Sequence, residues 1–165
     1  RTVISLLLIS ISMQAQNNLK GALWAARKVD GVYILSIHDR AGLIEAFTDF
    51  VTKNHIRAGS ITGIGAVNEA TLRFFNPEAK QYVDKAFSEQ MEISNLTGNI
   101  STKDGKPYLH VHITLGNKNY SAYAGHLLDA KIRGAGEFYI TPVDALIERT
   151  FSEEVGLNFY DFEKP

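Results

Sequence analysis

The sequence predicts an α+β domain made of a mostly antiparallel sheet with one clear long helix. Short segments rich in β-branched and aromatic residues recur between Gly, Pro, Asn and Asp turn residues, as consecutive antiparallel strands do. Residues 42–54 instead repeat apolar side chains at helical spacing, at Leu43, Ile44, Phe47, Phe50 and Val51. With 165 residues, of which 45% are hydrophobic, one domain with one core is the expected organisation.

The first half of the chain supplies a strand, the helix and a glycine-rich segment. Residues 31–38 are rich in Val, Ile and Tyr and favour a strand. Asp39 follows and is a candidate cap for the helix. Residues 58–67 are glycine-rich but lack the GxGxxG order of a phosphate-binding loop. Their glycines therefore indicate a bulge or a close backbone approach within a strand.

The second half is predicted to consist of strands and turns. The Asn-Pro turn at residues 76–80 joins two strands, and the Asp-Gly turn at residues 103–106 leads into a histidine-containing strand. Residues 143–151 fit a helix or a strand equally well, and residues 158–165 show no clear period. Strands are expected at residues 70–75, 81–83, 91–94, 96–101, 107–116 and 137–141.

Three of the five histidines fall within one predicted hairpin, at positions 110, 112 and 126. Side chains of a strand alternate between its faces, so His110 and His112 share one face while Val111 and Ile113 occupy the other. Two histidines at this spacing are also common as ordinary strand residues that face solvent. The hairpin register decides whether His126 joins them.

The length of the hairpin loop sets this register. A three-residue loop at residues 117–119 pairs His112 with Ala124 and His110 with His126, and all three imidazoles then line one face. A two-residue loop would instead place His126 on the far face. Asn at positions 117 and 119 favours the longer loop, because Asn tolerates the positive φ that such loops require.

Three neutral imidazoles are a suitable ligand set for zinc or another late first-row divalent metal. The chain has no cysteine, so we expect an open site whose fourth position accepts water or a small molecule. Weak candidates for a catalytic acid or base are Glu92, Glu137 and Asp129. Either glutamate is also a possible fourth ligand, which would close the site. His38 and His55 lie at element ends and are expected at the surface.

The charge balance argues against nucleic-acid binding. The formal net charge is −1, so no basic surplus is available to neutralise phosphates. Lys20, Arg27 and Lys28 form a sparse basic cluster near the N-terminal end, and it is not interleaved with aromatic residues. We expect no nucleic-acid partner.

Residues 1–16 resemble a secretory signal peptide. An apolar run covers residues 3–11, the small residue Ala15 follows, and the run is shorter than the roughly 20 residues that span a bilayer. We therefore expect an exported protein, in the bacterial periplasm, with residues 17–165 as the mature domain and no membrane span. The alternative is a buried N-terminal strand or helix in a cytoplasmic protein.

Several segments in order resemble the plants-and-prokaryotes-conserved (PPC) domain family. The likeness covers residues 32–140, and the segments that carry it are residues 56–67, 70–82, 92–100, 110–112 and 125–128. The resemblance implies a compact α+β fold that assembles as a homotrimer. It also implies that His110, His112 and His126 are metal ligands, as in bacterial and archaeal members.

The wider fold of this family is similar to acetolactate decarboxylase, an enzyme with a three-histidine zinc site. Plant members of the family are associated with DNA and carry an Arg-Gly-Arg-Pro segment, which this chain lacks. The plant Gly-Arg-Phe-Glu-Ile-Leu motif falls on residues 89–94, where only Glu92 and Ile93 match. The plant partner interaction is therefore not expected here.

Three functions remain open from the sequence. The first is a metal site that binds a small molecule, with lyase or hydrolase chemistry possible at an open zinc position. The second is a DNA-binding or regulatory protein, which the charge opposes. The third is a non-catalytic trimeric assembly module in which the metal stabilises a subunit boundary.

Overall fold

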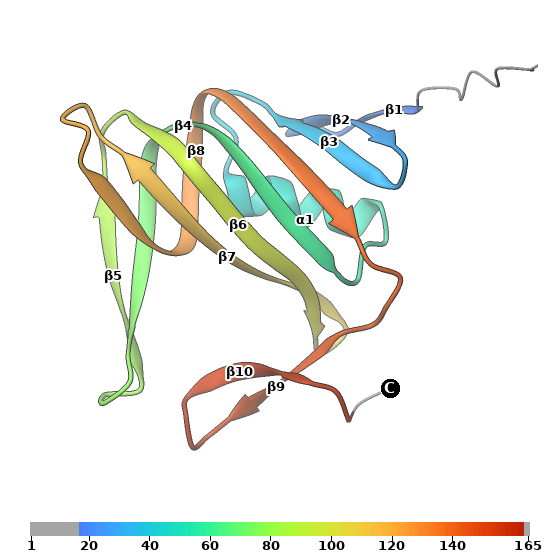
Figure 1. Cartoon of the computed structure of the whole chain (residues 1–165), viewed down its shortest axis with the longest axis vertical. Helices are drawn as coiled ribbons and strands as arrows, with labels where there is room; N and C mark the ends of the chain where they lie inside the picture. Colours follow the sequence, from blue (N-terminus) through green and yellow to red (C-terminus); the bar gives the residue numbers. More distant parts are fainter. Residues whose placement is uncertain (1–16, 164–165) are drawn as a thin grey trace, which may run out of the picture.

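Ten strands and one helix make up residues 17–163, the part of the chain that this computed structural model describes (Figure 1). The elements are β1 (Asn17–Lys20), β2 (Trp24–Val29), β3 (Val32–Ile37), α1 (Leu43–Lys53), β4 (Gly59–Asn76), β5 (Gln81–Phe87), β6 (Met91–Lys103), β7 (Lys106–Gly116), β8 (Ala122–Pro142), β9 (Glu148–Ser152) and β10 (Leu157–Asp161).

All ten strands belong to one sheet, in the order β1-β2-β3-β8-β4-β6-β9-β10. β5 pairs with β4, and β7 pairs with both β6 and β8. The pairings are antiparallel except for one parallel contact, between Thr102 of β6 and Glu148 of β9. The prediction of a mostly antiparallel sheet with one helix is confirmed, although the described chain is largely β.

The strands β4 and β8 are the longest and pair with each other along most of their length. Because β6 pairs with β4, β7 with β6, and β8 with both β7 and β4, these four strands form a closed circuit of pairings. The far end of β4 continues past the circuit and pairs with β5 as a projecting hairpin, here called the β4–β5 arm (Figure 1).

The glycine-rich segment predicted as a strand forms the first half of β4. A side chain at Gly63 would collide with Phe138 and with the β8 backbone, and one at Gly65 would meet the backbone at Ala135. The β4–β6 register also shifts between these two glycines. The expected close approach and bulge are therefore both present, and they let β4 and β8 lie tightly together.

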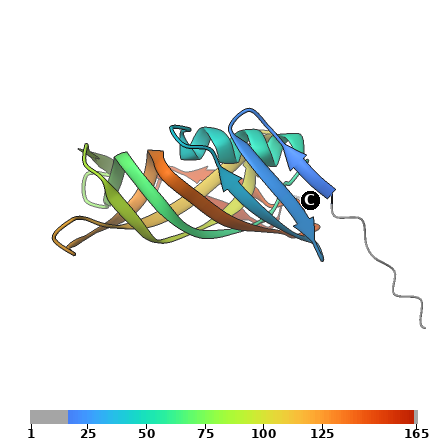
Figure 2. The same ribbon diagram turned by 90° about the horizontal axis from the view of Figure 1, so that it is seen from above.

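Helix α1 covers one face of the curved sheet (Figure 2). Leu43, Ala46, Phe47, Phe50 and Val51 are buried, as the helical spacing predicted. The predicted cap Asp39 is wrong: its carboxylate accepts hydrogen bonds from the backbone N–H of Gly134 and from Arg133. Gly42 occupies the N-cap position, and Asp129 of β8 accepts the backbone N–H of Ile44 instead.

The N-terminal strands β1 and β2 extend the sheet beyond β3 and were not predicted. Trp24 of β2 is buried and packs edge-to-face on Phe50, with ring centroids 4.8 Å apart. Tyr33 of β3 meets the same ring at 5.1 Å, and Phe47 meets Phe138 at 5.0 Å. These aromatic contacts join the helix to β2, β3 and β8, which are neighbours in the sheet.

Two further differences concern the second half of the chain. Residues 91–94 and 96–101 belong to one strand, β6, with a register shift between Ile93 and Asn95. The ambiguous segment 143–151 and the aperiodic tail contain β9 and β10, which pair as a C-terminal hairpin. The predicted signal peptide, residues 1–16, lies outside the described residues, so export stays a prediction. Within residues 17–163, no helix is long and apolar enough to cross a membrane.

Asp49 links the helix to β2. Its carboxylate accepts a 2.8 Å hydrogen bond from the Trp24 indole and a 2.9 Å bond from Lys53. The bond from Lys53, followed by that from Trp24, lowers the pKa of Asp49 below its ordinary value of 3.8. A carboxyl group whose pKa is lowered on folding stabilises the folded state at pH values above its ordinary pKa. This stabilisation is lost as the pH falls through the pKa of the folded state.

We predict that Asp49→Ala lowers the free energy of unfolding by about 1–2 kcal/mol at pH 7. Asp49→Asn should cost less, because the amide oxygen can still accept the Trp24 bond. The difference between wild type and Asp49→Asn should shrink below pH 3.8, as measured by urea unfolding. Glu78→Gln, at an exposed turn position, is the matched control. A pH-independent difference would contradict this account.

Candidate metal centre

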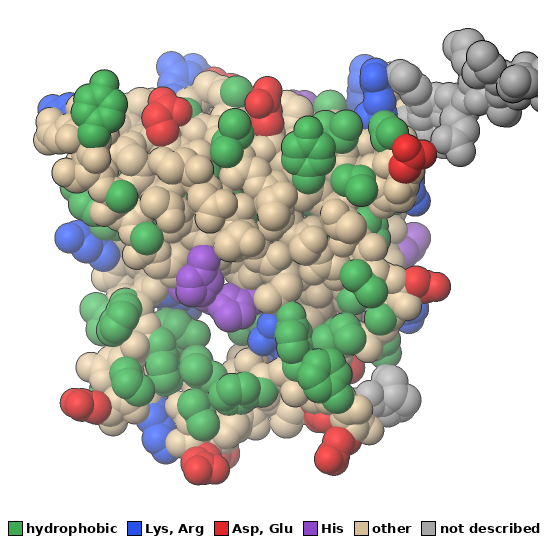
Figure 3. Space-filling model, viewed as in Figure 1, with side chains coloured by type: hydrophobic (Ala, Val, Ile, Leu, Met, Phe, Trp, Pro, Cys, Tyr) green, Lys and Arg blue, Asp and Glu red, His purple; other side chains and the backbone are tan. Residues whose placement is uncertain are grey.

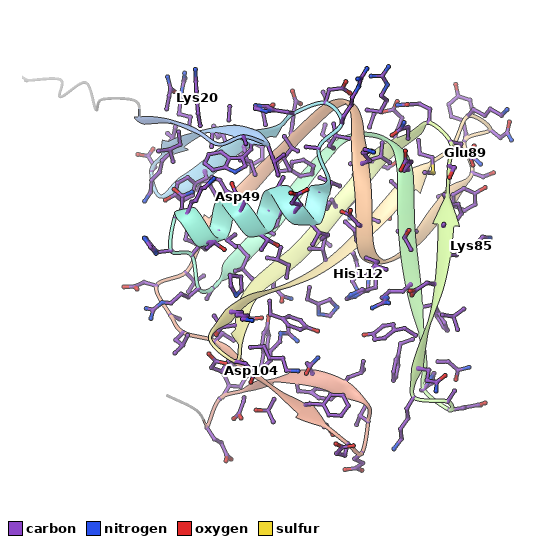
Figure 4. The ribbon with its side chains drawn as sticks, turned by 180° about the vertical axis from the view of Figure 1, so that it is seen from behind. Lys20, Asp49, Lys85, Glu89, Asp104 and His112 are labelled. Atoms are coloured by element: carbon purple, nitrogen blue, oxygen red, sulfur yellow. The ribbon has the colours of Figure 1, made fainter. Side chains whose placement is uncertain are left out.

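Three histidines lie together on adjacent strands, His110 and His112 on β7 and His126 on β8. The intervening residues Val111 and Ile113 are buried in the core, so the histidines project from the opposite face. Figure 4 places His112 between the β4–β5 arm and the C-terminal hairpin. The expected alternation along β7 is confirmed.

The predicted hairpin register is wrong by two residues. His112, not His110, lies directly opposite His126, and Thr114 lies opposite Ala124. The pairing ends at Gly116 opposite Ala122, so residues 117–121 form the loop in place of the expected 117–119. A shift of two residues preserves the face of every side chain, and His126 therefore still lies beside the other two.

The loop is longer because Asn117 organises it. The side-chain oxygen of Asn117 accepts the backbone N–H groups of Asn119 and Ser121, and its amide donates to the Tyr123 hydroxyl at 3.1 Å. Tyr120 adopts the positive φ, at 60°, which the sequence had suggested for an Asn. These bonds depend on a side chain more than on the backbone turn type, and loop-length preferences do not reveal them.

The spacing of the ring nitrogens fits a metal ion. One nitrogen from each histidine lies within 4.8 Å of the others, and the Nε2 atoms of His110 and His112 are 3.2 Å apart. Two imidazole nitrogens that bind zinc at about 2.0–2.1 Å in tetrahedral geometry lie about 3.3 Å apart. The same 3.2 Å distance also suits an N–H···N hydrogen bond when one ring carries its proton on Nε2.

The environment keeps the buried imidazoles neutral. Burial, followed by the charges of the neighbouring His110 and His112, lowers the pKa of His126 to about 4. Burial also lowers the pKa of His110, helped by the charges of Arg149 and His112. At neutral pH these rings therefore hold free lone pairs, which is the state that metal coordination requires.

The histidines form the floor of a pocket of about 530 Å³. One wall is the β4–β5 arm and the other is the C-terminal hairpin, and Figure 3 shows the histidines above a hollow with hydrophobic side chains on both sides. The tips of the two hairpins meet where the Lys80 ammonium donates to the Glu153 carbonyl oxygen at 3.3 Å. Aromatic lining residues are Phe74, Phe75, Tyr82, Tyr108, Phe159 and Tyr160.

Arg73 supports the β8 side of the site. It pairs with His126 across β4 and β8, and it makes two 2.8 Å hydrogen bonds to the Asp84 carboxylate on β5. These bonds lower the pKa of Asp84. The Tyr82 ring lies near both Arg73 and His126. Its centroid is 4.8 Å from the Arg73 guanidinium carbon and 5.7 Å from the centroid of the His126 ring.

Arg149 is a pocket residue that the sequence did not reveal. It lies on β9, in the segment that fitted helix or strand equally, and only 6% of it is exposed. Its guanidinium lies against the rings of Tyr108 and Tyr160 at 4.8 and 4.3 Å. No local pattern marks Arg149, because the C-terminal hairpin brings it to β6 from far along the chain.

The carboxylates named as acid–base candidates do not line this pocket. Glu92 and Glu137 are exposed and border a different hollow beside Gly65, and Asp129 bonds to the start of α1. His38 and His55 are exposed, as expected. Among residues 17–163, the three histidines are the one group of metal-ligating residues close enough to share an ion. A larger hollow of about 810 Å³ over β1–β3 has no histidine in its lining.

Comparisons with known proteins place the fold and the family. Residues 25–144 match the model of the Plants and Prokaryotes Conserved (PCC) domain, which is the PPC domain. A comparison with curated proteins gave no match. A provisionally named DNA-binding protein from Bacteroides thetaiotaomicron is 51% identical, with a TM-score of 0.84 over 86% of this chain and 99% of that one.

Two other solved structures extend the comparison. A metal-containing protein from Archaeoglobus fulgidus is 32% identical, with a TM-score of 0.75 over 90% of this chain and 99% of that one. Acetolactate decarboxylase from Bacillus subtilis is 13% identical, with a TM-score of 0.51 over 80% of this chain and 71% of that one, and this likeness concerns the fold alone. The family model and the two closer structures agree with the observed sheet, and the chain belongs to the Plants and Prokaryotes Conserved domain family.

Proposed function

We propose that this protein binds a zinc-like divalent metal through His110, His112 and His126, and that a small molecule in the adjoining pocket completes the coordination. The observation that carries the proposal is the convergence of three imidazole nitrogens within 4.8 Å at the floor of a pocket. The metal-containing relative from Archaeoglobus fulgidus, 32% identical, supports it.

The residues that line the pocket decide which groups could act beside a metal. A bound zinc ion would supply a Lewis acid able to polarise a carbonyl group, which lyase and hydrolase reactions use. The described lining residues include no Asp or Glu, so an acid or base for proton transfer would have to be one of the tyrosines Tyr82, Tyr108 and Tyr160. Within one subunit, the surrounding aromatic and arginine side chains hold and orient a ligand.

We predict about one zinc ion per chain in purified protein, and loss of most of it in His112→Ala, because two imidazoles cannot replace three. His38→Ala and His55→Ala, which alter exposed histidines outside the cluster, should retain a full equivalent. Elemental analysis after dialysis measures the difference. A full equivalent in His112→Ala or His126→Ala would contradict the three-histidine site.

Removing the metal provides a second measurement of the same proposal. An ion that binds only the folded state, at a free concentration of 100 times its dissociation constant, stabilises that state by about 2.7 kcal/mol. A chelator should therefore lower the melting temperature of wild type but leave that of His112→Ala unchanged. Equal melting of wild type with and without chelator would indicate that the 3.2 Å contact is only a hydrogen bond between imidazoles.

We further propose that the chain assembles as a homotrimer, as its likeness to the PPC family implies. The single chain leaves large apolar side chains uncovered on the β4–β5 arm and just after β10: Phe74 is 73% exposed and Phe162 is 77% exposed. Exposed apolar surface of this kind favours contact with other subunits. An assembly role for the metal remains compatible with this arrangement.

Light scattering should give three times the mass of one chain. Phe74→Asp should reduce the assembled fraction, because it places a charge on the uncovered arm. Tyr120→Ser changes a residue of the β7–β8 loop that is 98% exposed and belongs to neither the β4–β5 arm nor the C-terminal hairpin, and it should leave the mass unchanged. A monomeric mass for wild type at all concentrations would rule out the trimer.

DNA binding is the alternative raised by the name of the Bacteroides relative. Non-specific affinity depends on neutralising phosphates, and this chain has a net charge of −1. We predict no shift of duplex DNA at sub-micromolar protein near physiological salt. A strongly salt-dependent shift under those conditions would make DNA binding the better proposal.

A further inference from the structure

Arg149 is a buried cation whose hydrogen-bond partners among residues 17–163 are all neutral. Its Nε donates to the Ser101 hydroxyl at 2.8 Å, and its two terminal nitrogens donate to the Asn158 carbonyl at 3.0 Å and to the Asn99 side-chain oxygen at 2.9 Å. None of the ion pairs found within residues 17–163 includes it. A guanidinium does not lose its proton in a protein, so burial without a counter-charge is costly.

The guanidinium retains donors that a ligand can use. Three of its N–H groups bond to Ser101, Asn158 and Asn99, and a guanidinium carries five. The Tyr108 and Tyr160 rings lie against the guanidinium, with centroids 4.8 and 4.3 Å from its carbon. An anion such as a carboxylate is the acceptor that suits the two remaining N–H groups, because it also balances the charge.

Arg149 lies next to the histidines. Asn99, which accepts one of its bonds, is paired directly with His110 across β6 and β7. Paired residues in such a ladder have Cβ atoms about 4.5–5.5 Å apart. Arg149 and all three histidines also line the same pocket. A molecule of modest size can therefore contact the guanidinium and the histidine floor together.

Arg73, the other arginine of the pocket, differs from Arg149 because a carboxylate balances its charge. Its guanidinium already makes two 2.8 Å bonds to Asp84. The pocket thus contains one arginine whose charge is balanced and one whose charge is not. Six of its lining residues are aromatic, and its volume of about 530 Å³ falls within the range of small-molecule sites.

We propose that the pocket binds a small aromatic carboxylate, whose carboxylate group is held by Arg149 and whose ring lies between the β4–β5 arm and the C-terminal hairpin. The inference rests on the proposed function in taking this pocket as the ligand site. The anion preference itself comes from Arg149 and does not require the metal.

Titration calorimetry with benzoate and benzamide tests the proposal, because the two probes share size and ring but differ in charge. Wild type should bind benzoate at least about tenfold more tightly than benzamide, the effect of one charge-assisted hydrogen-bond pair. Arg149→Gln should lower benzoate affinity about tenfold and leave benzamide affinity unchanged. Arg133→Gln, an exposed arginine paired with Asp39, should change neither.

Arg149→Lys provides a second variant in case Arg149→Gln does not fold, because lysine keeps the positive charge. It should bind benzoate with intermediate affinity, because lysine lacks the planar pair of donors. Equal affinities of wild type for benzoate and benzamide would overturn the proposal, and this comparison needs no variant. Unchanged benzoate binding in a folded Arg149→Gln protein would overturn it as well.

The same titrations in metal-free and zinc-loaded protein separate this inference from the proposed function. Zinc binding without a benzoate preference refutes the role of Arg149 and leaves the metal site standing. A benzoate preference in protein that binds no zinc supports Arg149 and refutes the metal site. If Arg149→Gln instead weakens assembly in light scattering and the assembled wild type ignores benzoate, the anion is a carboxylate of a second chain, and the small-molecule proposal fails.

Discussion

The pairing of β4 with β8 is the constraint on which the rest of the molecule depends. β8 pairs with β3 near its C-terminal end and with β7 near its N-terminal end, and β4 pairs with β8 before it continues into the β4–β5 arm. They approach closely because Gly63 and Gly65 present no side chain to the Phe138 segment. The helix packs against one end of this pair, and His126 and Arg73 face each other near its other end.

The site combines two kinds of positioning. The histidines sit on β7 and β8, strands that are hydrogen-bonded to neighbours within the closed circuit, and their alternate residues are buried in the core. Burial also keeps His126 neutral, with a pKa of about 4. Arg149 depends on a different support, because three neutral acceptors on β6 and β10 and two tyrosine rings hold it in place.

The parts of this structure that follow from local periodicity could be predicted from sequence. The helix at residues 43–53 and the shared face of His110 and His112 follow from spacings of 3.6 and 2 residues. The hairpin register could not be predicted, because Asn117 sets it through side-chain bonds across the loop. Arg149 and the C-terminal hairpin could not be placed either, since the contacts of Arg149 with Ser101 and Asn99 join residues 48 and 50 positions apart.

The outer strands of the two pocket walls have fewer neighbours in the sheet than the floor has. β5 pairs with β4, and β10 pairs with β9, whereas β7 of the floor pairs with both β6 and β8. The tips of the two walls touch each other through Lys80 and Glu153. Mutations in either hairpin can therefore reshape the ligand chamber while the floor stays intact, so specificity can diverge during evolution without loss of the histidine cluster.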